Sequence, residues 1–284
     1  MSGLDFTLEE YKYTDEQVKS RIEEYSKSDL KYFSNTSDAF KFLLNVIDLT
    51  TLEGADNTKK IADLCAKALS YKDEARGVKP TAAVCVYPVF VAQAKKALEG
   101  TPVHVASVAG AFPAGQSPIE IKVAEVEYAA RCGADEIDMV ISRGKFLEGN
   151  YKEVYDEIVA IKKACGKAHL KVILETGELK THENIYKASQ IAIAAGADFI
   201  KTSTGKVPVN ATPESFIVML DAIKAHYEKT GKMVGMKPAG GIADAQSALS
   251  FLKILENVLG EKWLTNEYFR IGASRLADKV FAEI

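Results

Sequence analysis

Two lysines end neighbouring apolar segments, where an amine could act on a carbonyl compound. Lys201 follows the apolar run DFI, and Lys237 follows MVGM, 36 residues further along the chain. Loss of hydration in an apolar strand disfavours the charged form of a lysine and lowers its pKa. A second ammonium on the adjacent strand, about 4.8 Å away, would repel the first and favour a neutral amine near pH 7. A neutral amine forms Schiff bases, so the pair predicts covalent amine catalysis.

Each lysine also has an ordinary structural interpretation. Lys201 could pack its stem while its head reaches solvent. Lys237 could form an ion pair with Asp138 or Glu175, and a pair with Asp138 would itself act as a proton relay. Lys171 and Glu175, on the fifth apolar run, either extend this charged network or face the helices. Cys85 is expected in the core, with a place in the pocket wall as the alternative.

Glycine-containing segments after the last three apolar runs predict an oxyanion site. Glycine permits close approach of the backbone to a ligand, and free N–H groups attract negative charge. Each glycine alone is more often a turn residue, but their shared position favours a phosphorylated substrate. The expected phosphate-binding residues are Gly205, Lys206, Gly240, Gly241, Gly272 and Ser274, and Thr204 is a further expected substrate-binding residue. Asp48, with Thr50 beside it, ends the first run and could bind a substrate hydroxyl or serve as a cap or turn residue.

The elements that must position these residues alternate between strand-like and helix-like segments. The eight apolar runs span residues 45–50, 82–87, 103–109, 135–141, 170–176, 198–203, 233–238 and 268–273. Eight such units fit an α/β fold of the (β/α)8 TIM-barrel type, whose active site lies at the carboxyl ends of the strands. An open doubly wound sheet is the alternative, but no G-x-G-x-x-G motif opens a helix.

An internal repeat places two of the candidate residues together. The segments RCGADEIDMV and AAGADFIKTS align when Gly133 is set on Gly196, and Asp138 then falls on Lys201. The separation is 63 residues, or two units, and alternate strands of a barrel contribute to one interior layer. If both strands keep the same inward parity, the carboxylate and the amine stand at one depth.

Residues 1–36 lie outside this pattern and are expected to form an N-terminal helical extension to a barrel domain at 37–284. Thr14 and Gln17 occupy capping-box positions, and Val18, Ile22 and Tyr25 share one face of an amphipathic helix. The helix is expected to cover the bottom of the barrel, with contact to another subunit as the alternative.

Composition excludes several classes of function. The 284 residues carry 36 Lys+Arg against 39 Asp+Glu, without a basic stripe, so neither nucleic acid nor a membrane is an expected partner. The polar N-terminus and the lack of a long apolar stretch predict a cytoplasmic protein. The four cysteines and four histidines have no metal-ligand spacing, so no metal is expected. No cofactor is expected either.

Together, DFIKTSTGK, NATPES, VGMKPAGGI, GADEIDMVI, IDLTTL and RIGAS resemble deoxyribose-phosphate aldolase, a class I aldolase, over about residues 40–284. VCVYP and FRIGAS are most similar to its eukaryotic branch. The resemblance implies metal-free cleavage of 2-deoxy-D-ribose 5-phosphate to D-glyceraldehyde 3-phosphate and acetaldehyde. It implies Lys201 as the Schiff-base lysine, Lys237 as the second lysine and Asp138 as the proton relay. The implied phosphate contacts are Gly205, Lys206, Gly240, Gly241, Gly272 and Ser274.

The chain departs from many relatives at two positions near the phosphate. Ala243 stands where an arginine is common, and Arg275 stands where a smaller residue is common, so Arg275 could compensate for the lost charge. The implied partners are the phosphorylated sugar, acetaldehyde and further copies of the chain, as a dimer or tetramer. The alternatives are a zinc-dependent class II aldolase, a phosphosugar isomerase or epimerase, and a non-catalytic phosphosugar-binding barrel.

Overall fold

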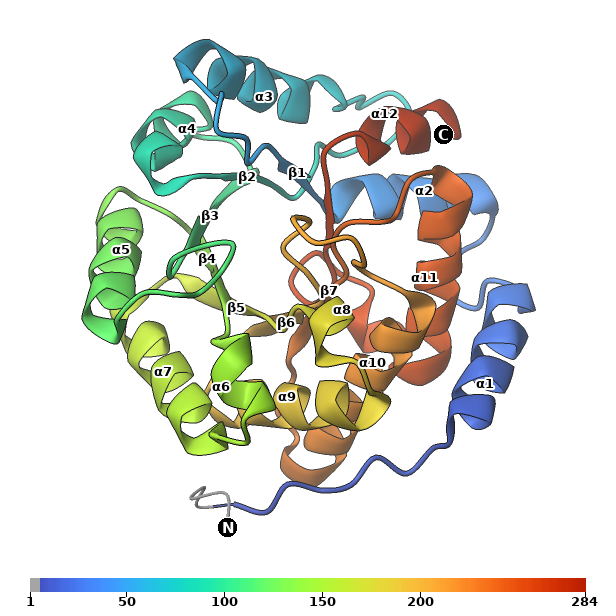
Figure 1. Ribbon diagram of the computed structural model, residues 1–284. Coiled ribbons are helices and arrows are strands. Elements are labelled where there is room, and N and C mark those ends of the chain that lie inside the picture. Colours follow the sequence, from blue (N-terminus) through green and yellow to red (C-terminus); the bar gives the residue numbers. More distant parts are fainter. Residues whose placement is uncertain (1–5) are drawn as a thin grey trace.

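The computed structural model describes residues 6–284, in which eight parallel strands form a ring surrounded by helices (Figure 1). The strands are β1 (Ile47–Thr50), β2 (Ala83–Val86), β3 (His104–Ala109), β4 (Glu136–Val140), β5 (His169–Ile173), β6 (Phe199–Lys201), β7 (Gly235–Lys237) and β8 (Ile271–Ala273). Their order follows the chain from β1 to β7, with β8 beside β1. Parallel bridges from Met236 to Phe269 and from Ala239 to Gly272 join the two ends, so the barrel closes as predicted.

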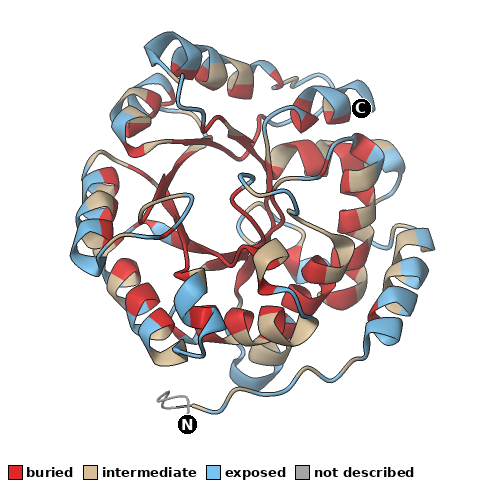
Figure 2. Cartoon of the chain, in the orientation of Figure 1, coloured by how far each residue is buried: buried red, intermediate tan, exposed pale blue. Residues whose placement is uncertain are grey.

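The helices that follow the strands form the outer ring. They are α3 (Thr58–Ser70), α4 (Val91–Ala97), α5 (Ile119–Arg131), α7 (Tyr151–Ala164), α9 (His182–Ala194), α10 (Pro213–Thr230), α11 (Ala245–Val258) and α12 (Leu276–Ala282). Short helices α6 (Arg143–Leu147), α8 (Thr176–Leu179), η1 (Pro88–Phe90) and η2 (Glu261–Trp263) lie in the connections. The strands are buried on both faces and the helices on their inner faces (Figure 2). Burial on both faces explains why the strands read as continuous apolar runs.

Local signals in the sequence set the ends of these elements. Thr212 caps α10 and forms a capping box with Ser215, Pro213 is the first helical residue, and Gly231 ends the helix with φ of 71°. Proline lacks the N–H that would be unpaired in the first turn, and glycine adopts positive φ without strain.

The two copies of the internal repeat have the same local structure, a glycine with positive φ followed by an aspartate that binds the preceding strand. Gly133 and Gly196 follow their helices with φ of 99° and 96°, and the chain then enters β4 and β6. In the first copy Asp135 accepts a backbone N–H from β3 at 2.9 Å, and in the second Asp198 accepts one from β5 at 2.6 Å. Each aspartate therefore ties its strand to the one before it, which gives β4 and β6 the same register and inward parity.

The N-terminal arm lies on the outside of the ring. Helix α1 (Asp15–Lys27) begins with the predicted capping box of Thr14 and Gln17 and packs against α10 and α11 (Figure 1). The expectation that it covers the bottom of the barrel is therefore wrong. Arg21 binds both oxygens of Asp221 on α10, at 2.7 and 2.8 Å. Helix α2 (Thr36–Asn45) follows and packs between α11 and α12.

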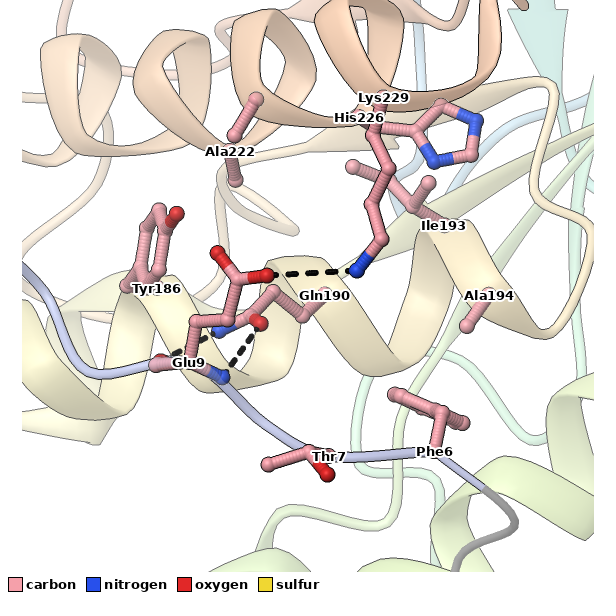
Figure 3. A pocket seen from close by; sticks show the side chains of 11 residues that line it. Phe6, Thr7, Glu9, Tyr186, Gln190, Ile193, Ala194, Ala222, His226 and Lys229 are labelled. Atoms are coloured by element: carbon pink, nitrogen blue, oxygen red, sulfur yellow. Dashed lines mark hydrogen bonds and ion pairs between the residues drawn. The ribbon is translucent and has the colours of Figure 1, made fainter.

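The segment before α1 runs along α9. The backbone N–H and carbonyl of Glu9 both form hydrogen bonds with the side-chain amide of Gln190, each at 2.9 Å. These bonds lie beside a pocket between the arm, α9 and α10 (Figure 3). Residues 1–5 of the predicted 1–36 extension lie outside the described residues, and the domain boundary at 37 stays a prediction. Within residues 6–284, every helix is too short or too polar to span a lipid bilayer.

Candidate active site

The two lysines singled out by the sequence meet at one carboxylate inside the barrel. Lys201 on β6 and Lys237 on β7 are direct partners in the strand register. Lys201 Nζ lies 2.7 Å and Lys237 Nζ 2.8 Å from Oδ2 of Asp138 on β4. The predicted meeting of Asp138 and Lys201 is thus confirmed, and the alternative of a lysine head in solvent is wrong because Lys201 is only 3% exposed.

Four further ionisable side chains extend this contact towards the other end of the barrel. Lys171 Nζ lies 3.0 Å from Asp138 Oδ1 and also bonds to Glu136. Arg270, just before β8, bridges Asp48 Oδ1 and Glu136 Oε1, at 2.8 Å each. The charged cluster consists of Asp48, Glu136, Asp138, Lys171, Lys201, Lys237 and Arg270.

The lysine and arginine side chains of this cluster outnumber its carboxylates. Its three carboxylates face four lysine and arginine side chains, an excess of one positive charge when all are ionised, and His104 beside the cluster also bonds to Glu136. Burial raises the pKa of each carboxyl, but the neighbouring cations outweigh it and hold all three pKa values below their ordinary range. Burial lowers the pKa of Lys171, Lys237 and Arg270, but the carboxylates outweigh it and raise all three values.

Lys201 is the basic group whose pKa falls. Burial is the largest cause of the lowered pKa; Asp138 opposes it, and the positive charge of Lys237 adds to it. The sequence-based argument named both desolvation and Lys237, and desolvation contributes more. Lys171 and Lys237 are fully buried, so Lys201 is also the only amine of the cluster with exposed surface. The cluster thus shifts one amine, that of Lys201, towards its neutral form.

An apolar wall lies beside this amine. Leu52, Cys85, Ala106 and Val108 form a small cluster separate from the main core, with Tyr87 and Phe112 against it. Burial raises the pKa of the Cys85 thiol to about 11, so the thiol stays protonated. Cys85 is fully buried, as predicted for a core residue. It also lies close enough to Lys201 for the charge of that lysine to influence the pKa of the thiol.

Asp48 has a different environment from the one expected. It is fully buried, Arg270 and Lys237 bind its two oxygens, and its own carbonyl accepts the hydroxyl of Thr50 at 2.8 Å. In this arrangement Asp48 holds Lys237 in place. Direct contact with a substrate hydroxyl stays a prediction for both residues.

Part of the predicted oxyanion rim lines one cavity of about 570 Å³. The residues that line it are Gly240, Gly241, Ile242, Ala243, Gly272, Ala273, Ser274, Arg275, Leu276 and Lys279. Gly240 and Gly241 have φ of 73° and 80°, and a Cβ on Gly240 would lie 2.8 Å from the side chain of Asn210. Glycine is therefore required here both by conformation and by space.

The remaining predicted rim residues lie in the β6–α10 loop, outside that cavity. Lys206 Nζ forms an ion pair with Glu53 of the β1–α3 loop at 2.9 Å. Thr204 binds Glu175, so the idea that Glu175 pairs with Lys237 is wrong. Gly205 has φ of 81° and open space beside it.

Sequence reasoning missed four residues around the site. Glu136 lies two positions before Asp138 and therefore points to the same side of the strand. Arg270 is a charged residue inside an apolar run. The same pattern had singled out Lys201. Lys279 donates to the carbonyl of Ala243 at 2.6 Å, and Glu53 reaches Lys206 across the rim; neither contact leaves a local trace in the sequence.

A closed parallel barrel with two lysines at the carboxyl ends of its strands defines a TIM-barrel fold. Residues 42–261 match the model of the DeoC/LacD family aldolase. The chain belongs to this family, and it is therefore an aldolase, a carbon–carbon lyase. Within the described residues, no group of three or more His, Cys, Asp or Glu side chains is placed to hold a metal ion.

Relatives and solved structures agree with this family. Human deoxyribose-phosphate aldolase is 50% identical over 84% of this chain and 78% of its own length. A Caenorhabditis elegans protein assigned the same name is 46% identical over 94% of this chain and 88% of its own. A crystal structure from Coccidioides immitis, assigned likewise, has a TM-score of 0.72 at 28% identity and covers 98% of both chains. The predicted family and its eukaryotic character are confirmed.

Proposed function

We propose that this aldolase reversibly cleaves 2-deoxy-D-ribose 5-phosphate to D-glyceraldehyde 3-phosphate and acetaldehyde through a Schiff base on Lys201. The substrate follows from the names of the human and nematode relatives. The observation that carries the chemistry is the lowered pKa of Lys201, which shares Asp138 with Lys171 and Lys237, whereas each of those two lysines also binds a second carboxylate.

In the proposed reaction, the neutral Nζ of Lys201 adds to the C1 aldehyde of the open-chain sugar, and loss of water gives an iminium ion. The iminium withdraws electrons from the C2–C3 bond. That bond breaks as the C3 hydroxyl loses its proton, which releases glyceraldehyde 3-phosphate and leaves an acetaldehyde enamine on Lys201. Protonation of the enamine at C2 and hydrolysis of the iminium then release acetaldehyde. The iminium is the electron sink, so the proposed reaction needs neither a metal nor a cofactor.

Asp138 and Lys237 move the protons in this scheme. Asp138 shares one oxygen with both amines, so a proton from the C3 hydroxyl can reach it directly, through Lys237 or through a water molecule. Asp48 keeps Lys237 charged and oriented towards Asp138, and Arg270 occupies the other oxygen of Asp48.

The phosphate is proposed to bind at the rim lined by Gly240, Gly241, Gly272 and Ser274, with Gly205 and Lys206 from the adjacent loop. Glycine N–H groups can approach phosphate oxygens closely. Arg275 and Lys279 line the same cavity and supply positive charge near Ala243, which carries none. We also propose that Thr204 contributes by holding this loop.

The direct test is product analysis. Purified protein is incubated with 2-deoxy-D-ribose 5-phosphate, with and without a chelator, and acetaldehyde and glyceraldehyde 3-phosphate are quantified by coupled assays. Equal amounts of both products, unaffected by chelation and lost in Lys201→Met, are expected. Isomerised sugar phosphate without acetaldehyde would indicate an isomerase, substrate binding without turnover a non-catalytic barrel, and loss of activity in the chelator a class II aldolase.

The proposed setting is the cytoplasm, where thiols such as the four free cysteines stay reduced. The expected homo-oligomer stays a prediction, which light scattering of the purified protein tests by its mass.

A further inference from the structure

Glu175, directly after β5, has an unusual backbone for its residue type. Its φ and ψ are 57° and 58°, in the left-handed region that a residue with a Cβ rarely adopts. Its side chain is fully buried, although a carboxylate is almost never buried without partners. A strained backbone under a buried charge persists only where the surroundings require it, and such positions concentrate at functional sites.

The carboxylate of Glu175 binds the loop between β6 and α10. One oxygen accepts the backbone N–H of Thr204 at 3.1 Å, and the other accepts the Thr204 hydroxyl at 2.5 Å. The same hydroxyl oxygen accepts the backbone N–H of Lys206 at 3.0 Å. A continuous chain of hydrogen bonds thus runs from Glu175 through Thr204 to Lys206, with Gly205 held between the two.

The packing around this chain holds the loop from two sides. A Cβ on Gly177 of α8 would lie 2.2 Å from the carbonyl oxygen of Val209, so α8 presses directly on the loop. The backbone N–H of Thr176 donates to the carbonyl of Thr202 at 2.9 Å. On the other side, Asn210 lies against Gly240. The loop is therefore fixed between α8 and the rim cavity.

Glu175 is unsuited to bind the phosphate itself. A carboxylate repels a phosphate dianion, and both of its oxygens already serve Thr204. Burial raises its pKa, Thr204 and Arg143 favour the charged form, and Glu178 adds repulsion that disfavours it. Its influence on a phosphate must pass through the loop that it holds.

We propose that Glu175 is a positioning residue that fixes Thr204, Gly205 and Lys206 in the conformation that receives the substrate's phosphate group. This inference rests on the proposed function and adds a determinant of phosphate specificity to it. It separates two roles within the site: the charged cluster performs the amine chemistry, and Glu175 sets affinity for the phosphorylated end of the sugar.

The test compares substrates with and without the phosphate. For Glu175→Ala, KM for 2-deoxy-D-ribose 5-phosphate is expected to rise about tenfold or more, because the loop loses two hydrogen bonds. Its kcat, and its kcat/KM for unphosphorylated 2-deoxy-D-ribose, should stay near wild type. Glu175→Gln should be milder, since the amide oxygen still accepts the Thr204 N–H. The matched control is Glu178→Gln, which alters a half-buried carboxylate on the same short helix that binds Arg143 and not Thr204, and it should change neither substrate's constants.

Equal losses for both substrates would overturn the proposal, as would an unchanged KM for the phosphorylated sugar. If Glu175→Ala does not fold, Thr204→Val removes the bridging hydroxyl and should give the same split, with Thr204→Ser restoring it. Trapping with acetaldehyde and borohydride keeps the two proposals apart: a wild-type protein that is not ethylated at Lys201 fails the proposed function, whereas normal trapping without the KM split fails this inference alone.

Discussion

Replacement of Lys237 by methionine should slow Schiff-base formation on Lys201. Lys237 carries a raised pKa and stays charged, and its charge helps to keep Lys201 neutral. Both amines bind the same oxygen of Asp138, at 2.7 and 2.8 Å, so their nitrogens are at most about 5.5 Å apart. At an effective dielectric constant of about 20, two charges at that separation repel by about 3 kcal/mol.

This repulsion sets the size of the expected effect. Without it, the neutral fraction of Lys201 near pH 7 falls on the order of 100-fold, because each 1.4 kcal/mol is about tenfold. Asp138 also loses a competing partner and holds the Lys201 proton more strongly, which acts in the same direction. The loss should shrink as the pH rises, because the amine of the variant then regains its neutral form.

The assay is the rate of borohydride-trapped ethylation of Lys201 by acetaldehyde, measured across pH for wild type, Lys237→Met and Lys237→Arg. Acetaldehyde carries no phosphate and no C3 hydroxyl, so the measurement isolates imine formation. The arginine variant retains the positive charge and should keep the wild-type pH profile. If Lys237→Met forms the imine at the wild-type rate with an unshifted profile, repulsion from Lys237 does not tune Lys201.

Three further outcomes are expected. Lys201→Met should unfold at a higher urea concentration than wild type at pH 7, and this advantage should diminish as the pH rises towards 10.5, since burial lowers the folded-state pKa of the amine below that ordinary value. Glu53→Gln should lower KM for 2-deoxy-D-ribose 5-phosphate by up to about fivefold in steady-state assays, because it releases Lys206 from an exposed ion pair worth at most about 1 kcal/mol. Gly272→Ala should reduce kcat about tenfold or more without loss of the circular dichroism spectrum, because its Cβ would lie 2.8 Å from Ala239 and 3.2 Å from Cε of Lys237.

The barrel was predictable because its signals are local. Each strand is buried on both faces and so reads as an unbroken apolar run, and the Gly-Ala-Asp repeat marks two equivalent strand starts. The same repeat brought Asp138 and Lys201 together, since equal spacing from Gly133 and Gly196 gives equal depth in the barrel.

Other features depend on contacts between distant parts of the chain. The apolar face of α1 predicts that this helix packs, but its position is set by Asp221, 200 residues from Arg21. Likewise, the partner of Lys206 is 153 residues away. The environment of Glu175 was hidden for another reason: its backbone is left-handed, with φ of 57°, and glutamate gives no local signal for that conformation.

The central claim is that Lys201, and no other amine of the site, is neutral and reachable enough to form a covalent bond with an aldehyde. Incubation with acetaldehyde and borohydride at pH 7, followed by peptide mapping by mass spectrometry, tests it directly. The account predicts a single ethyl group on Lys201, with Lys171, Lys206 and Lys237 unmodified at the same reagent dose. An ethyl group on Lys237 in place of Lys201, or no adduct in a catalytically active preparation, would contradict it.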